Sequence, residues 1–370
     1  MTSQPAGAAP LTPPGRADGR SAALGGLLLT AVLAVVLLLW AKWLPYTDRI
    51  GTLRGTGAWS GSSILGVGGV QPGDVPTWQA GTSFLSAYLS AVWRALLAAL
   101  LIAAALQAFV SRAWVLRVMN RRTGLRGAAV GGLLSTPSMM CTCCTAPVAA
   151  TLSRSGVSTA AVVAYWLGNP LLNPAVLVFL SLAAPWEWAV TRLVAGVVLV
   201  VGGAALVARL APTAVPSSAA GEVLVSTGGP TGSGLAGAPG RFARALGRMC
   251  VTLVPEYLLL VLAIGAFRGW LFPLGQSATS LGLLTVVLAT VVGTLLVIPT
   301  AGEIPVLQGL ALAGLSAGAI GALLVTLPAV SLPGMVMLGR SLGWRVTTTT
   351  AAVVAVGGLG AGGLLWALTG

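Results

Sequence analysis

Three cysteines in four positions, following two methionines, are the strongest chemical signal in this chain. They lie in an apolar segment bracketed by Pro137 and Pro147. Thiolate and thioether sulfur are soft ligands that suit Cu(I), and trivalent arsenic and antimony are thiophilic in the same way. A Cys-x-Cys-Cys run at a helix break can present two or three sulfurs to one centre, with Met139 and Met140 as thioether donors. The candidate ligands for a substrate, a soft metal or a metalloid are Cys141, Cys143 and Cys144.

The alternative for each thiol is a packing role, because a free cysteine usually behaves as a small buried hydrophobe. Three thiols so close together at a predicted break favour a site, whereas Cys250, alone at the start of an apolar span, is expected to be structural. The spacing is not that of a disulfide framework, and depth in a membrane predicts reduced thiols. The chain has no histidine, so the commonest metal ligand is absent.

Glu303 is the second candidate, since it lies near Pro305 within an apolar run. An acid inside a membrane is costly and therefore suggests function. It is a candidate for proton coupling or for contact with a polar part of the substrate. The alternative is that the carboxylate anchors its loop by accepting backbone N–H groups. Thr300, in the same motif, is placed with it as a substrate-binding candidate.

Asn169 and Asn173 complete the candidate substrate-binding set. Each precedes a proline in the apolar segment after the cysteine run. Their amides could face a cavity, or they could cap a break in the helix.

The composition defines the setting for these residues. The chain has 370 residues, of which 56% are hydrophobic and 7% charged, and its mean hydropathy is +0.94. Such values exclude an ordinary soluble domain and indicate an integral membrane protein of all-α class. The net charge of +13 comes from arginines in short clusters between apolar spans. These clusters indicate topology, so we do not expect nucleic-acid binding.

The lengths of the apolar runs, and the stretches rich in Pro, Gly or Arg between them, predict about 8–10 membrane segments and six regions. The regions are a disordered cytoplasmic tail (1–21), an N-terminal transmembrane helix (22–44), an extracytoplasmic loop (45–82), a first transmembrane repeat (83–210), a cytoplasmic linker (211–248) and a second transmembrane repeat (249–370). The candidate segments after the first helix are 84–110, 127–153, 157–184, 188–210, 250–272, 281–298, 306–339 and 346–368.

The two halves are predicted to be related. Pro147 and Pro170 recur as Pro305 and Pro328, because 305 − 147 and 328 − 170 both equal 158, and a Gly-x-Ser element recurs at the same interval. Paired broken segments in two halves are typical of transporters built from repeats.

Charge then predicts the orientation of the halves. The arginine clusters at 112–126 and 241–248 place the end of the second span and the end of the linker on the cytoplasmic side. An even number of crossings must separate them, so the segment 127–154 is expected to be a re-entrant hairpin, broken at Pro137 and Pro147 with the cysteines at its tip. The segment 281–313, with Pro299 and Pro305 at its tip, would enter from the opposite face. This is an inverted-repeat plan.

These motifs resemble those of the ArsP family of predicted permeases. The resemblance rests on two blocks and covers most of the membrane part. The first block runs from Thr136-Pro137 through Cys141-Thr142-Cys143 and Pro147 to Asn169-Pro170 and Asn173-Pro174, and the second comprises 298–305 and 328–333. Characterised members export trivalent organoarsenicals, so the resemblance implies an exporter. Family members usually have a Cys-Ser-Cys-Gly type motif, whereas this chain has Thr142 and Cys144.

Three function classes follow. The first is a secondary-active permease exporting trivalent organoarsenicals or related metalloids, the second a Cu(I) transporter, and the third a membrane thiol redox protein using the Cys-x-x-Cys spacing of Cys141 and Cys144. No nucleotide-binding motif is visible, and neither histidine nor a Met-rich outer segment supports metal transport. We therefore favour the permease and expect no enzymatic activity and no cofactor. The expected partners are a small thiophilic solute and the lipid bilayer of the plasma membrane; the sequence gives no oligomeric state.

Overall fold

The computed structural model describes residues 16–57, 64–120, 124–212, 237–271 and 283–370. Every regular element in these ranges is helical, which confirms the predicted all-α class. Six continuous helical segments are long and apolar enough to cross a membrane: Ala23–Thr56, Trp78–Phe109, Thr159–Ala183, Trp186–Leu210, Ala238–Trp270 and Trp344–Thr369. A seventh candidate is a pair of helices, Ala317–Ala329 and Leu332–Leu342, bent by 50°. The chain is therefore a multi-pass membrane protein.

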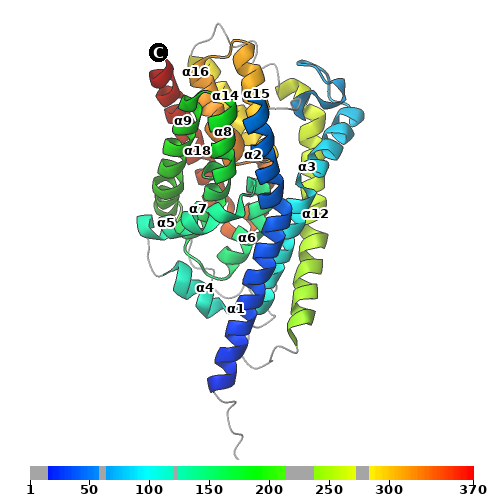
Figure 1. Ribbon diagram of the computed structural model, residues 1–370, viewed down its shortest axis with the longest axis vertical. Helices are drawn as coiled ribbons and strands as arrows, with labels where there is room; N and C mark the ends of the chain where they lie inside the picture. The colour runs from blue at the N-terminus through cyan, green and yellow to red at the C-terminus, as the bar shows by residue number, and fades with distance from the viewer. Residues whose placement is uncertain (1–15, 58–63, 121–123, 213–236, 272–282) are drawn as a thin grey trace, which may run out of the picture.

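The N-terminal segment forms one long helical rod (Figure 1). It comprises α1 (Arg16–Leu38), the π-type turn η1 (Leu39–Trp43) and α2 (Leu44–Thr56). Residues 16–21, expected to belong to a disordered tail, are helical, and the rest of that tail lies outside the described residues. The expected loop 45–82 likewise contains α2, the short helix η2 (Ile64–Gly69) and the start of α3 (Trp78–Phe109).

Two long helices, α3 and α12 (Ala238–Leu271), run side by side (Figure 1). Small residues allow their close approach. A Cβ atom added to Gly81 would lie 3.0 Å from the Leu262 carbonyl oxygen, and one added to Gly265 would lie 2.7 Å from the Phe84 side chain. This is how helices commonly pack in lipid, where small residues let backbones come together.

Two further pairs of helices are short. The first pair is α5 (Gly124–Ser135) and α6 (Thr142–Arg154), joined by the turn η3 (Thr136–Ser138). The second pair is α14 (Leu283–Leu295) and α15 (Glu303–Leu312). A 13-residue helix is about 20 Å long at 1.5 Å per residue, which is shorter than the roughly 30 Å hydrocarbon core. None of the four can cross a bilayer by itself.

Three details differ from the sequence-based expectation. Pro147 does not break its segment, because α6 continues through it; the break lies around Pro137. A proline inside a membrane helix removes one hydrogen bond, which its surroundings can compensate. The stretch 306–339, expected as one segment, consists of most of α15, all of α16 (Ala317–Ala329) and most of α17 (Leu332–Leu342). In the described part of segment 281–298 the helix is the short α14.

Helix boundaries recur along the chain at the interval predicted from the prolines. The bounds of α7 (Thr159–Leu171) and α16 differ by 158 at both ends, and α6 and α15 end at residues 154 and 312. The helices α9 (Trp186–Val197) and α18 (Trp344–Thr369) begin with tryptophans at the same interval. Gly156 and Gly314, each two residues beyond the last residue of α6 or α15, have φ values of 85° and 88°, a conformation that glycine adopts without strain. The recurrence is therefore present in the backbone as well as in the sequence.

The remaining helices complete the bundle and link its parts. They are α4 (Arg112–Met119), α8 (Pro174–Ala183), the π-type η4 (Val198–Gly203) and α10 (Ala204–Leu210). The helix α6 packs against α17 of the second half. At the end of α15, Gln308 donates a hydrogen bond to the Ala183 carbonyl at the end of α8. The short helices α6 and α15 thus each contact a helix of the other half.

Candidate thiol site between two broken helices

The cysteine cluster forms where the chain turns from α5 into α6. Pro137 lies in the turn η3, and Met139 has a left-handed backbone conformation with φ of 49°. Such a conformation is uncommon for a residue other than glycine and is often found at functional sites. Cys141 then occupies the N-cap position of α6, so that Cys143 and Cys144 fall in its first turn. The turn brings all three thiols to one end of the helix.

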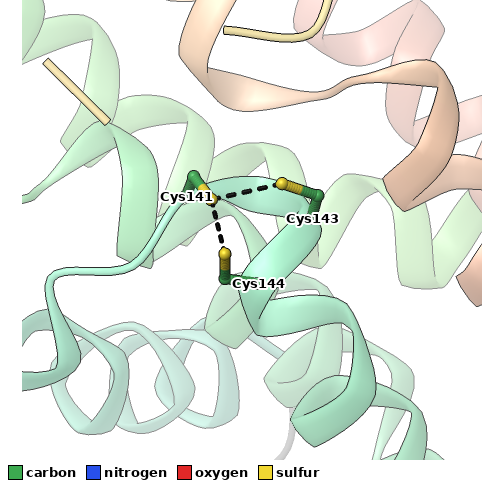
Figure 2. Close-up of side chains that lie close together, drawn as sticks. All are labelled: Cys141, Cys143 and Cys144. Carbon is green, nitrogen blue, oxygen red and sulfur yellow. Dashed lines mark hydrogen bonds between the residues drawn. The ribbon is translucent and has the colours of Figure 1, made fainter. Parts of the chain in front are cut away.

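The three sulfur atoms lie close together, as Figure 2 shows. The Sγ atom of Cys141 is 3.2 Å from that of Cys143 and 2.9 Å from that of Cys144. All three Sγ atoms lie within 4.8 Å of one another, and the residues are at most 5% exposed. They are free thiols. A single thiophilic atom could therefore bind two or three of them, whereas Cys250 is exposed and lies on α12.

Two tyrosine hydroxyls surround Cys143. The hydroxyl of Tyr88, on α3, is 3.2 Å from the Cys143 Sγ atom, and that of Tyr257, on α12, is 3.5 Å away. Both side chains are at most 1% exposed. These tyrosines were not singled out in the sequence, because nothing in their local pattern distinguishes them from packing aromatics. They give Cys143 polar neighbours in an otherwise apolar core.

Thr142 ties the tip of α6 to the second half of the chain. Its hydroxyl donates to the carbonyls of Pro328 and Ala329, where α16 ends and the chain bends into α17. The Trp166 indole N–H on α7 donates to the Thr142 carbonyl at 3.1 Å. Thr142 therefore positions the cysteine turn against a helix break.

Asn169 holds the turn that precedes the cysteines. Its Oδ1 atom accepts a hydrogen bond from the Ser138 hydroxyl, and the Met140 backbone N–H lies 3.4 Å from the same oxygen. Its amide nitrogen donates to the Tyr165 carbonyl at 3.1 Å. Asn169 is thus placed beside the site with its polar atoms used by the protein.

Asn173 caps α8, as one of the two alternatives drawn from the sequence expected. Its Oδ1 atom accepts from the backbone N–H groups of Ala175 and Val176 at 3.1 and 3.3 Å. The break between α7 and α8 is therefore stabilised by a standard N-cap. The Nδ2 atom of Asn173 is buried and has no hydrogen-bond partner among the described residues.

Glu303 forms a buried ion pair with a residue from the other half of the chain. Its Oε1 atom is 2.9 Å from the Nη1 atom of Arg192 on α9, and the two side chains are 3% and 1% exposed. Arg192 also donates to the Pro170 carbonyl at 2.7 Å, at the C-terminal end of α7. Sequence reasoning missed Arg192, although the signal that identified Glu303, a charged residue within an apolar segment, applies to Arg192 as well.

Lys42 reaches the site from the N-terminal helix. Its Nζ atom is 3.2 Å from the Thr300 hydroxyl and 3.1 Å from the Tyr46 hydroxyl. It is 5% exposed and lies near enough to interact electrostatically with Cys141 and Cys144 in their thiolate forms. Sequence reasoning did not single out Lys42. Thr300 therefore connects a buried cation to the turn that precedes Glu303.

A cavity of about 10 Å³ lies where these elements meet. It is lined by Cys141, Pro170, Ile298, Thr300, Glu303, Leu327 and Pro328. The ends of α7 and α16, the turn that carries Cys141 and the turn before α15 therefore meet at this cavity. Three of the predicted site residues line it: Cys141, Thr300 and Glu303. A volume of this size holds about one water molecule. The described conformation is closed around the site, so any larger solute needs a movement of the surrounding helices.

Comparison with known proteins points to a membrane permease. A family model described as "predicted permease", ArsP_1, matches residues 78–362. The chain is 40% identical over 333 residues to the UPF0718 protein YraQ of Escherichia coli (strain K12), and the match covers 90% of this chain and 92% of that protein. No solved structure matches the chain. The family description indicates a membrane transporter that moves a small solute across the bilayer. The chain belongs to the ArsP_1 family of predicted permeases.

Proposed function

We propose that this permease exports trivalent organoarsenicals, or related thiol-reactive metalloids, by secondary-active transport. The observation that carries the proposal is the cluster of three buried thiols, whose Sγ atoms all lie within 4.8 Å of one another. Trivalent arsenic prefers sulfur ligands, as soft centres do. A cluster at the tip of a short helix can bind such a centre without any metal cofactor.

The binding step is a ligand exchange. A monosubstituted arsonous acid, R–As(OH)₂, reacts with two thiols to give R–As(S–Cys)₂ and two molecules of water. Cys143 and Cys141 form the first pair, because their sulfur atoms are 3.2 Å apart and Cys143 has the Tyr88 hydroxyl beside it. Cys144 supplies a weaker third contact. Hydrolysis reverses the exchange, returns one proton to each sulfur and releases the arsonous acid.

Alternating access follows from an inverted-repeat arrangement of the two halves. In this proposal the pair α5–α6 and the pair α14–α15 are re-entrant hairpins that enter from opposite faces, and rocking of one half against the other opens the closed cavity to either side. The buried Arg192–Glu303 pair joins the halves at that point. Protonation of Glu303 would remove its charge and weaken this contact, which makes Glu303 the proton-coupling candidate. Asn169, Asn173 and Thr300 position the backbone around the substrate.

Uptake by everted membrane vesicles tests the proposal. Vesicles with the parent protein should accumulate methylarsenite, and Cys143→Ser or Cys141→Ser should reduce the initial rate at least tenfold. The matched control is Cys250→Ser, which removes the exposed thiol outside the cluster and should transport like the parent. Equal transport by Cys143→Ser and the parent would show that the cluster does not carry the arsenical.

The second candidate substrate is Cu(I), favoured by the same three-sulfur geometry. The same vesicles distinguish it when they are supplied with Cu(I) in place of methylarsenite. Accumulation of Cu(I) alone, lost in Cys143→Ser and kept in Cys250→Ser, would assign the site to a soft metal.

A further inference from the structure

A large cavity between the N-terminal rod and α3 is lined by cations. We call it the Lys42 cavity; its volume is about 440 Å³. Lys42, Arg49 and Arg94 line it, and no aspartate or glutamate does so among the described residues. The Arg94 guanidinium lies over the rings of Trp40 and Trp93, 5.7 and 5.5 Å from their centroids, which holds it at the wall.

The Lys42 cavity leads towards the thiol site. Thr300 lines both this cavity and the small central cavity that contains Cys141 and Glu303. Lys42 donates to the Thr300 hydroxyl from the larger cavity. A solute in the Lys42 cavity would therefore meet a buried ammonium group immediately before it meets the sulfur atoms.

A second cavity lies at the other end of α6 and is also lined by cations. We call it the Arg154 cavity; its volume is about 270 Å³, and its basic residues are Arg112, Arg154, Arg248 and Arg340. Arg154 and Arg248 are near enough to repel each other electrostatically. The lining contains no acid among the described residues, although Glu256 pairs with Arg340 at 3.1 Å. Thr151, in the same lining, is about 12 Å along α6 from Cys143 at 1.5 Å per residue.

Basic residues line a cavity on each side of the thiols, and the rule that places arginines on the cytoplasmic side of a membrane does not explain both cavities. The preference for arginine on the cytoplasmic side accounts for basic residues at one end of the membrane helices only. The Lys42 cavity is built from η1, α2, η2, α3 and the turn before α15, whereas the Arg154 cavity is built from the ends of α3 and α6, the start of α4, the first half of α12 and α17. In Figure 1, α2 and α15 lie in the upper part and α4 in the lower part.

We propose that the permeant crosses as an anion: a thiol-reactive solute that also carries a negatively charged group such as a carboxylate or sulfonate. This inference rests on the proposed function for the step at the cysteines and adds the charge of the substrate. The thiols bind the soft centre, and the cations of the two cavities attract the acidic group before and after that step. A cleft lined by one sign of charge raises the local concentration of the opposite ion and its rate of entry by 10–10³-fold.

Three arylarsenicals test the charge requirement. The probes are phenylarsonous acid, its 4-carboxylate and its 4-trimethylammonio derivative, offered to phosphatidylcholine proteoliposomes that contain a trapped dithiol. Rates in protein-free liposomes are subtracted. We expect kcat/KM for the carboxylate to exceed that for the cation at least tenfold, and the preference to fall as ionic strength rises, because salt screens charges across open cavities.

Four variants locate the effect. Arg94→Gln in the Lys42 cavity and Arg154→Gln in the Arg154 cavity should each reduce kcat/KM for the carboxylate severalfold and leave the neutral probe within twofold. The controls are Arg54→Gln and Arg345→Gln, which remove exposed arginines that line neither cavity. They should leave all three rates unchanged.

The outcomes separate the two proposals. Transport of all three probes at similar rates, or a preference for the cation, would overturn the anion inference and leave arsenical transport standing. A second outcome would also overturn the inference. If Arg94→Gln and Arg154→Gln slowed transport of all three probes equally, and the parent protein reached its full rate only when anionic lipid was added to the vesicles, the arginines would serve lipid headgroups. Failure to transport any probe would overturn both proposals.

Discussion

Cys143 is the thiol with the most polar surroundings in the cluster. The hydroxyls of Tyr88 and Tyr257 are 3.2 and 3.5 Å from its sulfur, and a hydroxyl that donates to a thiolate stabilises the charged form that reacts with a soft centre. Cys144, at 0% exposure, has its sulfur nearest to that of Cys141. The three thiols are therefore not equivalent, although the sequence presents them as one run.

Tyr88→Phe tests the role of this hydroxyl. The change keeps the ring and removes the contact with Cys143, so we expect KM for methylarsenite to rise about fivefold, equivalent to roughly 1 kcal/mol for one hydrogen bond. Vesicle uptake measures it. Tyr257→Phe, whose contact is longer, should have a smaller effect. An unchanged KM in Tyr88→Phe, with unchanged protein abundance, would show that the ring only packs.

The buried Arg192–Glu303 ion pair should contribute more to stability than the Arg340–Glu256 ion pair, which is partly exposed. Removing one partner of a buried ion pair leaves a charge uncompensated and costs about 3–5 kcal/mol. Glu303→Gln should therefore lower the apparent melting temperature of the purified protein by several degrees, followed by tryptophan fluorescence. In the Arg340–Glu256 pair the arginine is 61% and the glutamate 17% exposed, so solvent reaches the arginine and screens the pair. Glu256→Gln provides the matched control and should cost about 1 kcal/mol, less than Glu303→Gln. Equal shifts in the two variants would contradict the structural role assigned to Arg192.

Close helix packing positions the elements around the site. A Cβ atom added to Gly131 on α5 would lie 2.2 Å from the Ala161 carbonyl oxygen on α7, and one added to Gly321 on α16 would lie 2.6 Å from the Ala361 carbonyl oxygen on α18. Both contacts are with backbone, which cannot move aside as a flexible side chain would. Thus α5 is held against α7, and α16 against α18, by close backbone contact, which is how helices pack in lipid.

Gly131→Ala should therefore destabilise the protein by about 1–3 kcal/mol, the usual cost of forcing extra volume into a packed core. It should also slow arsenical uptake, because a shift of α5 moves the turn that carries the thiols. The matched control is Gly360→Ala on α18, where an added Cβ meets nothing within 4 Å. A melting temperature for Gly131→Ala equal to that of the control would argue against close α5–α7 packing in the membrane.

The whole molecule can be tested for the inverted arrangement by labelling single cysteines from each side. In a Cys250→Ser background, Leu125→Cys reports on the start of α5 and Leu312→Cys on the end of α15; these leucines are 53% and 92% exposed. Opposed re-entrant hairpins predict that a membrane-impermeant maleimide reaches Leu125→Cys only from the cytoplasm and Leu312→Cys only from outside. The background alone should remain unlabelled, because the three site thiols are buried. Labelling of both positions from one side would exclude the opposed arrangement.

The sequence by itself determined the helical membrane class, the 158-residue interval, the thiol run and the presence of an acid, Glu303, within an apolar run. Composition, helix periodicity and the cost of an acid in lipid are local properties that can be read along the chain. Only the tertiary structure decided that Arg192 pairs with Glu303, that Lys42 approaches the cysteines, and that Pro147 leaves α6 intact. The tyrosines beside Cys143 belong with these. Such contacts join residues distant in sequence, and they depend on which glycine-lined faces come together, which no local pattern specifies.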